Sequence, residues 1–322
     1  MKKYYIGVDL GGTNIAVGLV NSDLSLVRKV SAPTKNGGDP DGIMKVMAEL
    51  CLKLVNEAGL TTDDIISCGI ASPGTANSDT GIVEYANNIA MLNYPIVDKL
   101  RALTGFEKIY LDNDANAAAL GEAIAGSAKG ATSAVVITLG TGVGGGIIID
   151  KKIYSGFNHA GAELGHTVIE KDGRPCTCGR RGCFEAYSSA TGLINITKDK
   201  MMKNPDSELW KRCDGDLSKI SGKSAFASMR ETGDETAKEV CKEYISYLAT
   251  GVANIMNIFQ PEVISIGGGV SNEGDPLFEP LKTLVYKENY AKNSPRVTRI
   301  ERATLGNDAG IIGAAALGAD KV

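Results

Sequence analysis

The chain has 322 residues, of which 43% are apolar and 22% are charged, and this predicts a globular protein of about two domains with a sizeable core. A net charge of −4 argues against nucleic acid or an anionic membrane as a partner. No apolar run approaches the roughly 18 residues of a membrane span, and Asp9 interrupts the N-terminal apolar stretch too early for a signal peptide, so a cytoplasmic location is predicted.

The first part of the chain alternates between strand and helix patterns. Short apolar segments bounded by turn residues predict strands over residues 4–9, 15–20, 24–31, 65–71 and 108–111. Asp39 and Pro40 are a favourable cap and first position for a helix, which apolar residues at helical spacing continue to Leu54. A loop rich in asparagine is expected before 108–111, and an alanine-rich helix over 115–125.

The later part repeats the opening pattern of strand, glycine turn and strand, which indicates two related halves. Further strands are predicted over residues 134–139, 144–150, 263–266 and 297–300, with a hairpin turn at Asp150 and Lys151. A long helix is expected over 234–259, because its apolar residues form one face. The final helix, 309–317, is expected to pack on the first domain.

Three glycine-rich turns follow predicted strands. One such turn is most often only a turn, but three favour a nucleotide, because backbone N–H groups can then approach a polyphosphate with no side chain in the way. Neither the P-loop pattern nor the dinucleotide fingerprint is present. Asp9 precedes the first turn and is expected to hold Mg²⁺, through water, against the phosphates of ATP. The turn residues concerned are Gly11, Gly12, Thr13, Asn14, Gly140, Thr141, Gly142, Gly268 and Gly269.

Two acids and two amides, within residues 112–116, join a predicted strand to a predicted helix. The carboxyl end of a strand is where α/β proteins build ligand sites. Asp114 has two interpretations that the residues alone leave open. It is either the helix N-cap, or a base that accepts the proton of a substrate hydroxyl.

A histidine and three cysteines lie within 18 residues, with the spacing H-x9-C-x-C-x4-C. His166, Cys176, Cys178 and Cys183 are predicted to form a closed tetrahedral Zn²⁺ site of the structural kind. Chance clustering or a redox pair is the alternative, although the C-x-x-C spacing of redox motifs is absent. The other four cysteines are scattered, which favours a reducing compartment over a disulfide framework.

Glu163 and Glu185 flank this zinc-binding segment. A lone glutamate is usually a solvated surface residue. Held beside a zinc-stapled loop, however, both are candidates to accept hydrogen bonds from the vicinal hydroxyls of a polyol.

Taken together, these segments resemble the repressor, open reading frame, kinase (ROK) family of sugar kinases, within the actin-like, ribonuclease-H-like ATPase superfamily. The resemblance covers essentially the whole chain and is most specific over residues 176–185. It implies a two-lobed α/β fold with an interdomain cleft. The smaller lobe would comprise residues 1–115 and about 305–322, and the larger lobe, with the zinc loop (residues 166–183), would comprise 116–304.

The same resemblance implies roles for individual residues. Asp114 would be the catalytic base, and Thr13 and Thr141 would meet phosphates, with Gly268 and Gly269 on the adenosine side. The residues implied to bind or line the sugar are Asn113, Glu163, His166, Glu185, Gly74 and Asn88. Around Asn88 the family often shows Asn-Leu followed by a Trp, and residues 87–94 depart from that pattern.

The implied activity is ATP-dependent phosphorylation of a hexose, with glucose as the expected substrate. N-acetylmannosamine, N-acetylglucosamine and fructose are alternative acceptors. A sugar-responsive repressor without catalysis is the alternative of another class, because the resembled family includes such members. The resemblance also implies a homodimer or a higher homo-oligomer.

Overall fold

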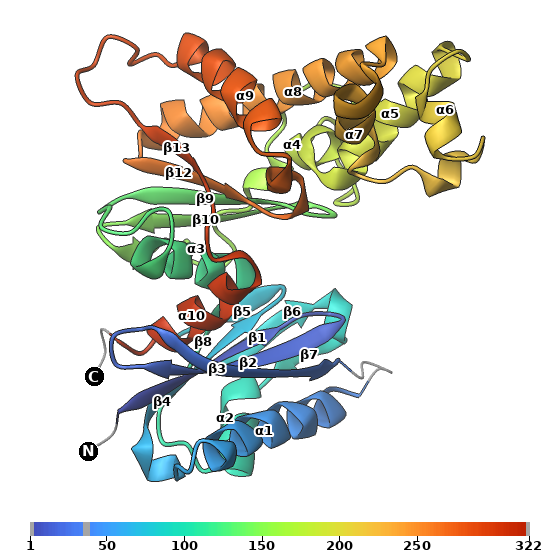
Figure 1. Cartoon of the computed structure of the whole chain (residues 1–322). Coiled ribbons are helices and arrows are strands. Elements are labelled where there is room, and N and C mark those ends of the chain that lie inside the picture. Colours follow the sequence, from blue (N-terminus) through green and yellow to red (C-terminus); the bar gives the residue numbers. More distant parts are fainter. Residues whose placement is uncertain (1–2, 35–38, 320–322) are drawn as a thin grey trace. The chain divides into compact units, whose positions relative to one another are not determined.

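Figure 1 shows the computed structural model of the protein, which describes residues 3–34 and 39–319. Contacts divide the chain into two compact units. The first is Met1–Val136, Gly146–Ala162 and Thr304–Val322, and the second is Ile137–Gly145 and Glu163–Ala303. This grouping differs from the predicted lobes, because it assigns residues 116–136 and 146–162 to the first unit. The lobes stay a prediction, and their terminal residues 1–2 and 320–322 lie outside the described residues.

The first unit contains a five-stranded sheet in the order β3-β2-β1-β4-β8. Its strands are β1 (Tyr4–Leu10), β2 (Asn14–Asn21), β3 (Leu26–Pro33), β4 (Ile65–Ser72) and β8 (Ile109–Asn113). β1, β4 and β8 run parallel, with Asp9 opposite Ala71 and Ala71 opposite Asp112. The carboxyl ends of these three strands therefore share one edge of the sheet, where Asp9 and Asp112 lie.

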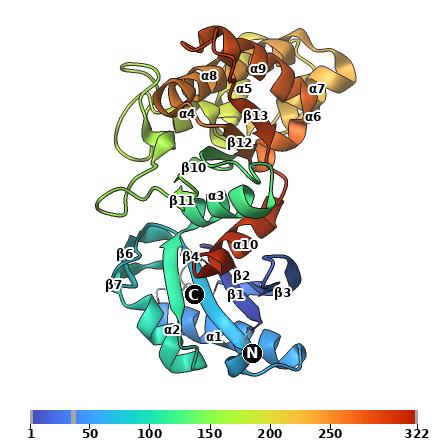
Figure 2. The ribbon, with the colours of Figure 1, turned by 90° about the vertical axis from the view of Figure 1, so that its left-hand side faces the viewer.

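Helices cover both faces of this sheet. On one face, α1 (Pro40–Glu57) and α2 (Ile96–Thr104) bury their apolar sides against the strands in one hydrophobic core. The other face holds α10 (Ala309–Ala316), which Figures 1 and 2 show along the sheet beside α3 (Asp114–Ala125). A Cβ at Gly7 or Gly69 would lie 1.9 or 1.7 Å from an α10 carbonyl oxygen, so α10 can approach only because glycines face it. The predicted packing of the last helix on the first domain is confirmed.

The region between β4 and β8 is more regular than the asparagine-rich loop that we expected. It contains a three-stranded antiparallel sheet, β5-β6-β7, made of Thr75–Asn77, Ile82–Ala86 and Met91–Tyr94, followed by α2. The loop expectation was wrong because strands of three to five residues are too short to show a clear alternation of apolar and polar residues.

A second five-stranded sheet has the order β11-β10-β9-β12-β13. Its strands are β9 (Ala134–Leu139), β10 (Val143–Ile149), β11 (Lys152–Ile153), β12 (Val263–Gly267) and β13 (Arg299–Arg302), and the division between the two units passes through β9 and β10. Asp150 and Lys151 have φ angles of 52° and 63° and form the turn between β10 and β11, which confirms the predicted hairpin.

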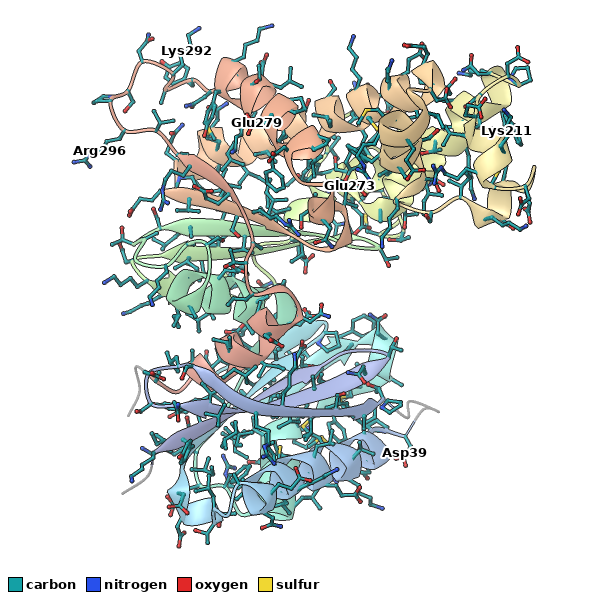
Figure 3. The ribbon with its side chains drawn as sticks, in the orientation of Figure 1. Asp39, Lys211, Glu273, Glu279, Lys292 and Arg296 are labelled. Atoms are coloured by element: carbon teal, nitrogen blue, oxygen red, sulfur yellow. The ribbon has the colours of Figure 1, made fainter. Side chains whose placement is uncertain are left out.

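Six α-helices belong to the described part of the second unit. They are α4 (Phe184–Ser188), α5 (Ala190–Lys203), α6 (Leu209–Arg212), α7 (Ser224–Thr232), α8 (Glu235–Phe259) and α9 (Asp275–Glu288). Of these six helices, only α8 was predicted from the sequence. Figure 3 shows Lys211, Lys292 and Arg296 pointing away from the ribbon, and all three are exposed.

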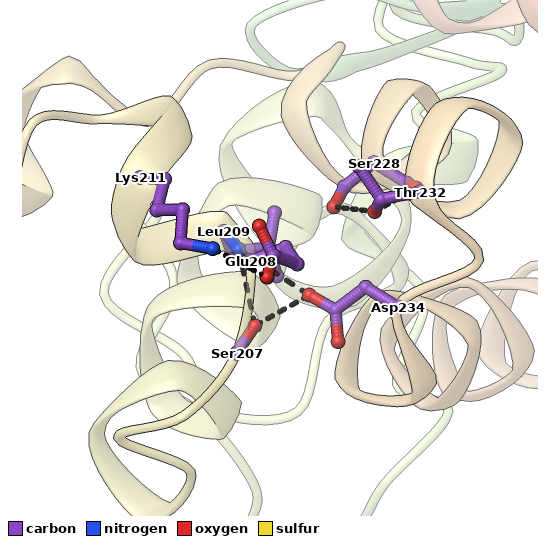
Figure 4. A network of polar contacts seen from close by, with 7 residues as sticks. All are labelled: Ser207, Glu208, Leu209, Lys211, Ser228, Thr232 and Asp234. Atoms are coloured by element: carbon purple, nitrogen blue, oxygen red, sulfur yellow. Dashed lines mark hydrogen bonds and ion pairs between the residues drawn. The ribbon is translucent and has the colours of Figure 1, made fainter.

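The start of α8 is fixed by a local polar network. Asp234 caps the helix by accepting a hydrogen bond from Thr236 N–H, at 2.9 Å. Its second carboxylate oxygen accepts from Ser207 Oγ, at 2.6 Å, which ties α8 to the segment before α6 (Figure 4).

Within residues 3–34 and 39–319, no helix combines the length and the apolar character that crossing a membrane requires.

Candidate functional site

Asp9 lies in β1, one residue before its end, and its carboxyl group is largely buried. Burial, and to a smaller extent the negative charge of Asp114, raises the pKa of Asp9 from 3.8 to about 6. An interaction of this kind requires the two carboxylates to be near one another. Asp9, near the end of β1, and Asp114, the residue that follows β8, thus form one electrostatic pair, the acid pair.

The glycine turn after β1 is closed by hydrogen bonds. Gly11 N–H donates to Asn14 O at 2.9 Å, and Thr34 Oγ donates to Gly11 O at 2.7 Å. Thr34 N–H also donates to Thr13 O at 2.8 Å, which fixes the far side of the turn. The turn is therefore held by Thr34, the residue that follows β3.

The turn from β8 into α3 shows which residue caps the helix. Asn113 is the N-cap, because its side-chain oxygen accepts from Ala115 N–H at 2.9 Å and from Asn116 N–H at 3.3 Å. Its amide group donates to Gly74 O at 3.0 Å. Asp114 is the first residue of the helix and accepts from the neighbouring Ala115 N–H. The capping interpretation of Asp114 was therefore wrong, and the capping residue is the one before it.

The buried carboxylate of Asp112 supports this turn by accepting two hydrogen bonds from it. Its side chain is only 7% exposed and accepts a hydrogen bond from the Asn116 amide at 2.9 Å, as well as from Asn113 N–H.

Asn88, from the region where the sequence departs from the family pattern, lies beside Gly12: a Cβ at Gly12 would be 3.3 Å from that of Asn88. In the first unit, one predicted sugar-lining residue, Asn88, thus lies close to the predicted phosphate turn.

In the second unit, two further glycine turns meet at the ends of β9 and β12. Gly268 has a φ of 85°, and a Cβ there would lie 2.5 Å from the backbone of Leu139, so only glycine fits. The turn over 140–142 is tied to the start of α5, because Ala190 N–H donates to Gly140 O and Thr191 Oγ donates to Thr141 O, both at 2.8 Å. Gly269 has open space beside it.

The histidine and the three cysteines predicted to bind zinc come together. Their ligand atoms all lie within 4.8 Å of one another, with 3.6 Å between Cys176 Sγ and His166 Nδ1 and 3.7 Å between the sulfurs of Cys178 and Cys183. Tetrahedral bonds of about 2.3 Å to sulfur and about 2.0 Å to nitrogen separate two sulfurs by about 3.8 Å and a sulfur from a nitrogen by about 3.5 Å. The residues therefore fit a zinc ion.

Glu185 joins the zinc loop to the glycine turn after β9. One carboxylate oxygen accepts from Val143 N–H at 3.0 Å, and the other accepts from Thr177 Oγ at 3.3 Å. A Cβ at Gly142 would lie 2.3 Å from this carboxylate, so the two segments are in direct contact. Glu163 is exposed, at the point where the chain enters the second unit.

A cavity of about 800 Å³ opens in the second unit beside these groups. Its walls include the predicted residues Thr141, Gly142, Cys176 and Glu185. The rest of its lining, including Arg174, Thr191, Asn195 and Lys198, was not predicted. Arg174 packs over the Tyr187 ring and pairs with Asp199 at 2.8 Å. Thr191, Asn195 and Lys198 were missed because α5, which carries them, was not predicted.

The sequence pattern of the ROK family matches residues 5–321. The chain belongs to the ROK family. It is 39% identical to a glucokinase of Halalkalibacterium halodurans, over 97% of this chain and 93% of that protein, and 37% identical to a glucokinase of Thermotoga maritima, over 97% and 96%. A solved ROK family glucokinase from Streptomyces griseus, in complex with glucose and AMPPNP, superimposes with a TM-score of 0.80 at 32% identity, covering 98% of each chain.

These similarities confirm the family resemblance and the predicted fold class, the actin-like α/β fold of ROK sugar kinases. The roles of the individual site residues stay predictions. Those in the first unit are Asp9, Gly11, Gly12, Thr13, Asn14, Gly74, Asn88, Asn113 and Asp114, and those in the second are Gly140, Thr141, Gly142, Glu163, His166, Glu185, Gly268 and Gly269.

Proposed function

We propose that this ROK family protein is an ATP-dependent glucose kinase, which transfers the γ-phosphate of ATP to the 6-hydroxyl of glucose. The observation that carries the proposal is the turn at the start of α3. Asn113 caps the helix, and this places the Asp114 carboxylate in the first turn of α3, directly after the carboxyl end of β8, where it would act as a base. The similarity to glucokinases over nearly the whole chain supports the same activity.

Asp114 would accept the proton of the 6-hydroxyl as that oxygen attacks the γ-phosphorus. The bond from the γ-phosphorus to the bridging oxygen then breaks, ADP leaves, and Asp114 returns its proton to water. Phosphoryl transfer requires mainly positioning and charge stabilisation from the protein. The Asn113 side chain is hydrogen-bonded to Gly74 O and to two backbone N–H groups, and it fixes the point at which β8 ends and α3 begins with Asp114.

The nucleotide would be bound by the glycine turns. Thr13 and Thr141 would contact phosphates, and Gly268 and Gly269 the adenosine side. The cavity beside Thr141 and Gly142 supports this assignment, because it is large enough for a ligand of nucleotide size. Asp9 would hold Mg²⁺ through water, and the ion, when bound with ATP, neutralises phosphate charge.

The zinc loop would position residues that bind the sugar. His166, Cys176, Cys178 and Cys183 would hold a structural Zn²⁺, whose contribution is to fix the loop. The sugar hydroxyls would be bound by Glu163, His166, Glu185 and Asn113, with Gly74 and Asn88 lining the pocket. Glu185 already touches both the zinc loop and the turn after β9, so ordering the loop would also order the acceptor.

Initial rates with ATP over a panel of hexoses and N-acetyl hexosamines test the proposal. We expect the highest kcat/KM for glucose, because each buried acceptor that an epimer leaves unpaired costs roughly 1 to 3 kcal/mol. A higher kcat/KM for N-acetylmannosamine, N-acetylglucosamine or fructose would reassign the substrate. Sugar binding without phosphorylation of any sugar would favour the repressor alternative. Light scattering of the purified protein tests the predicted homodimer.

A further inference from the structure

Glu122 is a buried acid that no part of the proposed reaction uses. It lies in α3, with a side chain only 1% exposed. Its carboxylate accepts hydrogen bonds from Ser127 N–H at 2.8 Å, Ser127 Oγ at 2.9 Å, Thr304 N–H at 3.0 Å and Leu305 N–H at 2.8 Å. No ion pair within residues 3–34 and 39–319 involves it. A buried carboxylate held by neutral donors is costly to desolvate, so its hydrogen bonds must be kept.

The donors come from two places that are far apart in sequence. Ser127 lies just after α3, whereas Thr304 and Leu305 lie directly before the short helix Gly306–Asp308 that leads into α10. Thr304 is also the residue at which the chain returns to the first unit. The Glu122 carboxylate therefore joins α3 to the segment that begins α10.

Beyond this anchor, α3 and α10 touch backbone to backbone. A Cβ at Gly121 would lie 2.3 Å from Ala309 O, and one at Gly313 would lie 1.6 Å from Ala117 O. Figures 1 and 2 both show the two helices side by side. At these two glycines no side chain separates the helices, so α10, which begins four residues after Leu305, packs directly against α3.

Each of the two helices is connected to one member of the acid pair. Asp114 is the first residue of α3. Gly310, in the first turn of α10, lies against Asp9: a Cβ there would be 2.6 Å from the Asp9 carboxylate. The two helices that Glu122 ties together thus support Asp114 and Asp9 respectively.

We infer that Glu122 is a positioning residue, which anchors Thr304 and Leu305 so that the start of α10 holds Asp9 in place relative to Asp114. This inference rests on the proposed kinase function. Loss of the anchor would disturb the alignment of the reacting groups more than the binding of either substrate, and small misplacements of such groups cost up to about 100-fold in rate.

Glu122→Gln tests the anchor, because the amide keeps the shape but turns an NH₂ group toward donors that need an acceptor. We expect kcat to fall about 10-fold to 100-fold, with the KM for glucose and for ATP nearly unchanged. Hydrogen exchange at the amides of Thr304 and Leu305 should accelerate. Ser127→Ala is the matched control: it removes one donor on the α3 side and should leave kcat and both amides nearly unchanged.

Rates are compared well below the melting temperature of each variant, so that unfolding does not contribute. An unchanged kcat in E122Q, or unchanged exchange at both amides, overturns the inference. If E122Q does not fold, Glu122→Asp, which withdraws the charge by one methylene, takes its place. Failure of the proposed function is distinguishable, since the unmodified protein would then phosphorylate no sugar, and the exchange at Thr304 and Leu305 would still decide whether Glu122 is the anchor.

Discussion

The zinc loop and the acid pair represent two ways of holding a functional group in place. The loop, residues 166–183, has little regular secondary structure, and two isolated bridges, Val168 with Cys183 and Pro175 with Arg181, shape it. The acid pair lies at the ends of strands in a hydrogen-bonded sheet, over a buried core. We therefore propose that the loop depends on a bound metal for its rigidity, whereas the acid pair depends on packing. The following predictions separate these two dependences.

The largest effect is expected for Asp114→Asn, which keeps the shape of the side chain and removes the proton acceptor. We expect kcat to fall by about 10² to 10⁴-fold while glucose and ATP still bind. Steady-state rates and isothermal titration measure the two effects. Asp275→Asn is the matched control, because Asp275 is likewise the first residue of a helix, α9, and the change should leave kcat unaltered. An Asp114→Asn variant within threefold of the parent rate would contradict the assignment.

Cys178→Ser should disable the zinc loop and leave the acid pair intact. The unmodified protein should contain about one zinc per chain, and the variant should lose zinc, thermal stability and glucose affinity together. Nucleotide affinity should change less. Lys171→Ser, at an exposed position of the same loop that offers no ligand, should keep the metal. Elemental analysis, melting curves and titrations measure these changes, and a zinc-free parent protein would rule out the site.

Asp9→Asn should stabilise the protein at neutral pH and impair its activity. The pKa of Asp9 is raised from 3.8 to about 6 in the folded protein, so folding favours the protonated acid. The resulting stabilisation is complete below pH 3.8 and is lost as the pH rises through about 6. The neutral asparagine avoids that loss, so the free energy of unfolding of Asp9→Asn should exceed that of the parent by up to about 3 kcal/mol at pH 7.

Urea unfolding without magnesium or nucleotide, at several pH values across this window, measures the difference between Asp9→Asn and the parent. It should grow with pH and level off above pH 6. A difference that does not change with pH would show that burial does not perturb this acid.

The smallest effect is expected at the glycine turns of the second unit. Gly268→Ala places a methyl group 2.5 Å from the Leu139 backbone at a φ of 85°, whereas Gly274→Ala, at a φ of 68°, meets nothing within 4 Å. Both variants carry the cost of a left-handed backbone, so their difference isolates the contact. We expect Gly268→Ala to cost about 1 to 3 kcal/mol more and to weaken ATP binding. Equal melting temperatures and equal KM values for ATP would show that the contact relaxes freely.

The sequence by itself determined the features whose residues lie close together along the chain. The four zinc ligands fall within 18 residues, so their spacing was enough to predict a cluster that the structure brings within 4.8 Å. The strands predicted over 4–9 and 108–111, the α8 helix and the hairpin at Asp150 and Lys151 were recognised for the same reason, and the structure contains all of them.

Other features were decided only by the tertiary structure. They depend on residues far apart in the sequence, or on neighbouring residues that are equally suited to one role. Asn113 and Asp114 are both good caps, and the approach of Gly74 to the Asn113 amide distinguishes them. The small sheet β5-β6-β7 forms because its short strands pair with one another. Glu122 meets Thr304 across 182 positions, and no local pattern of charge or hydrophobicity records a contact made by packing two helices through their glycines.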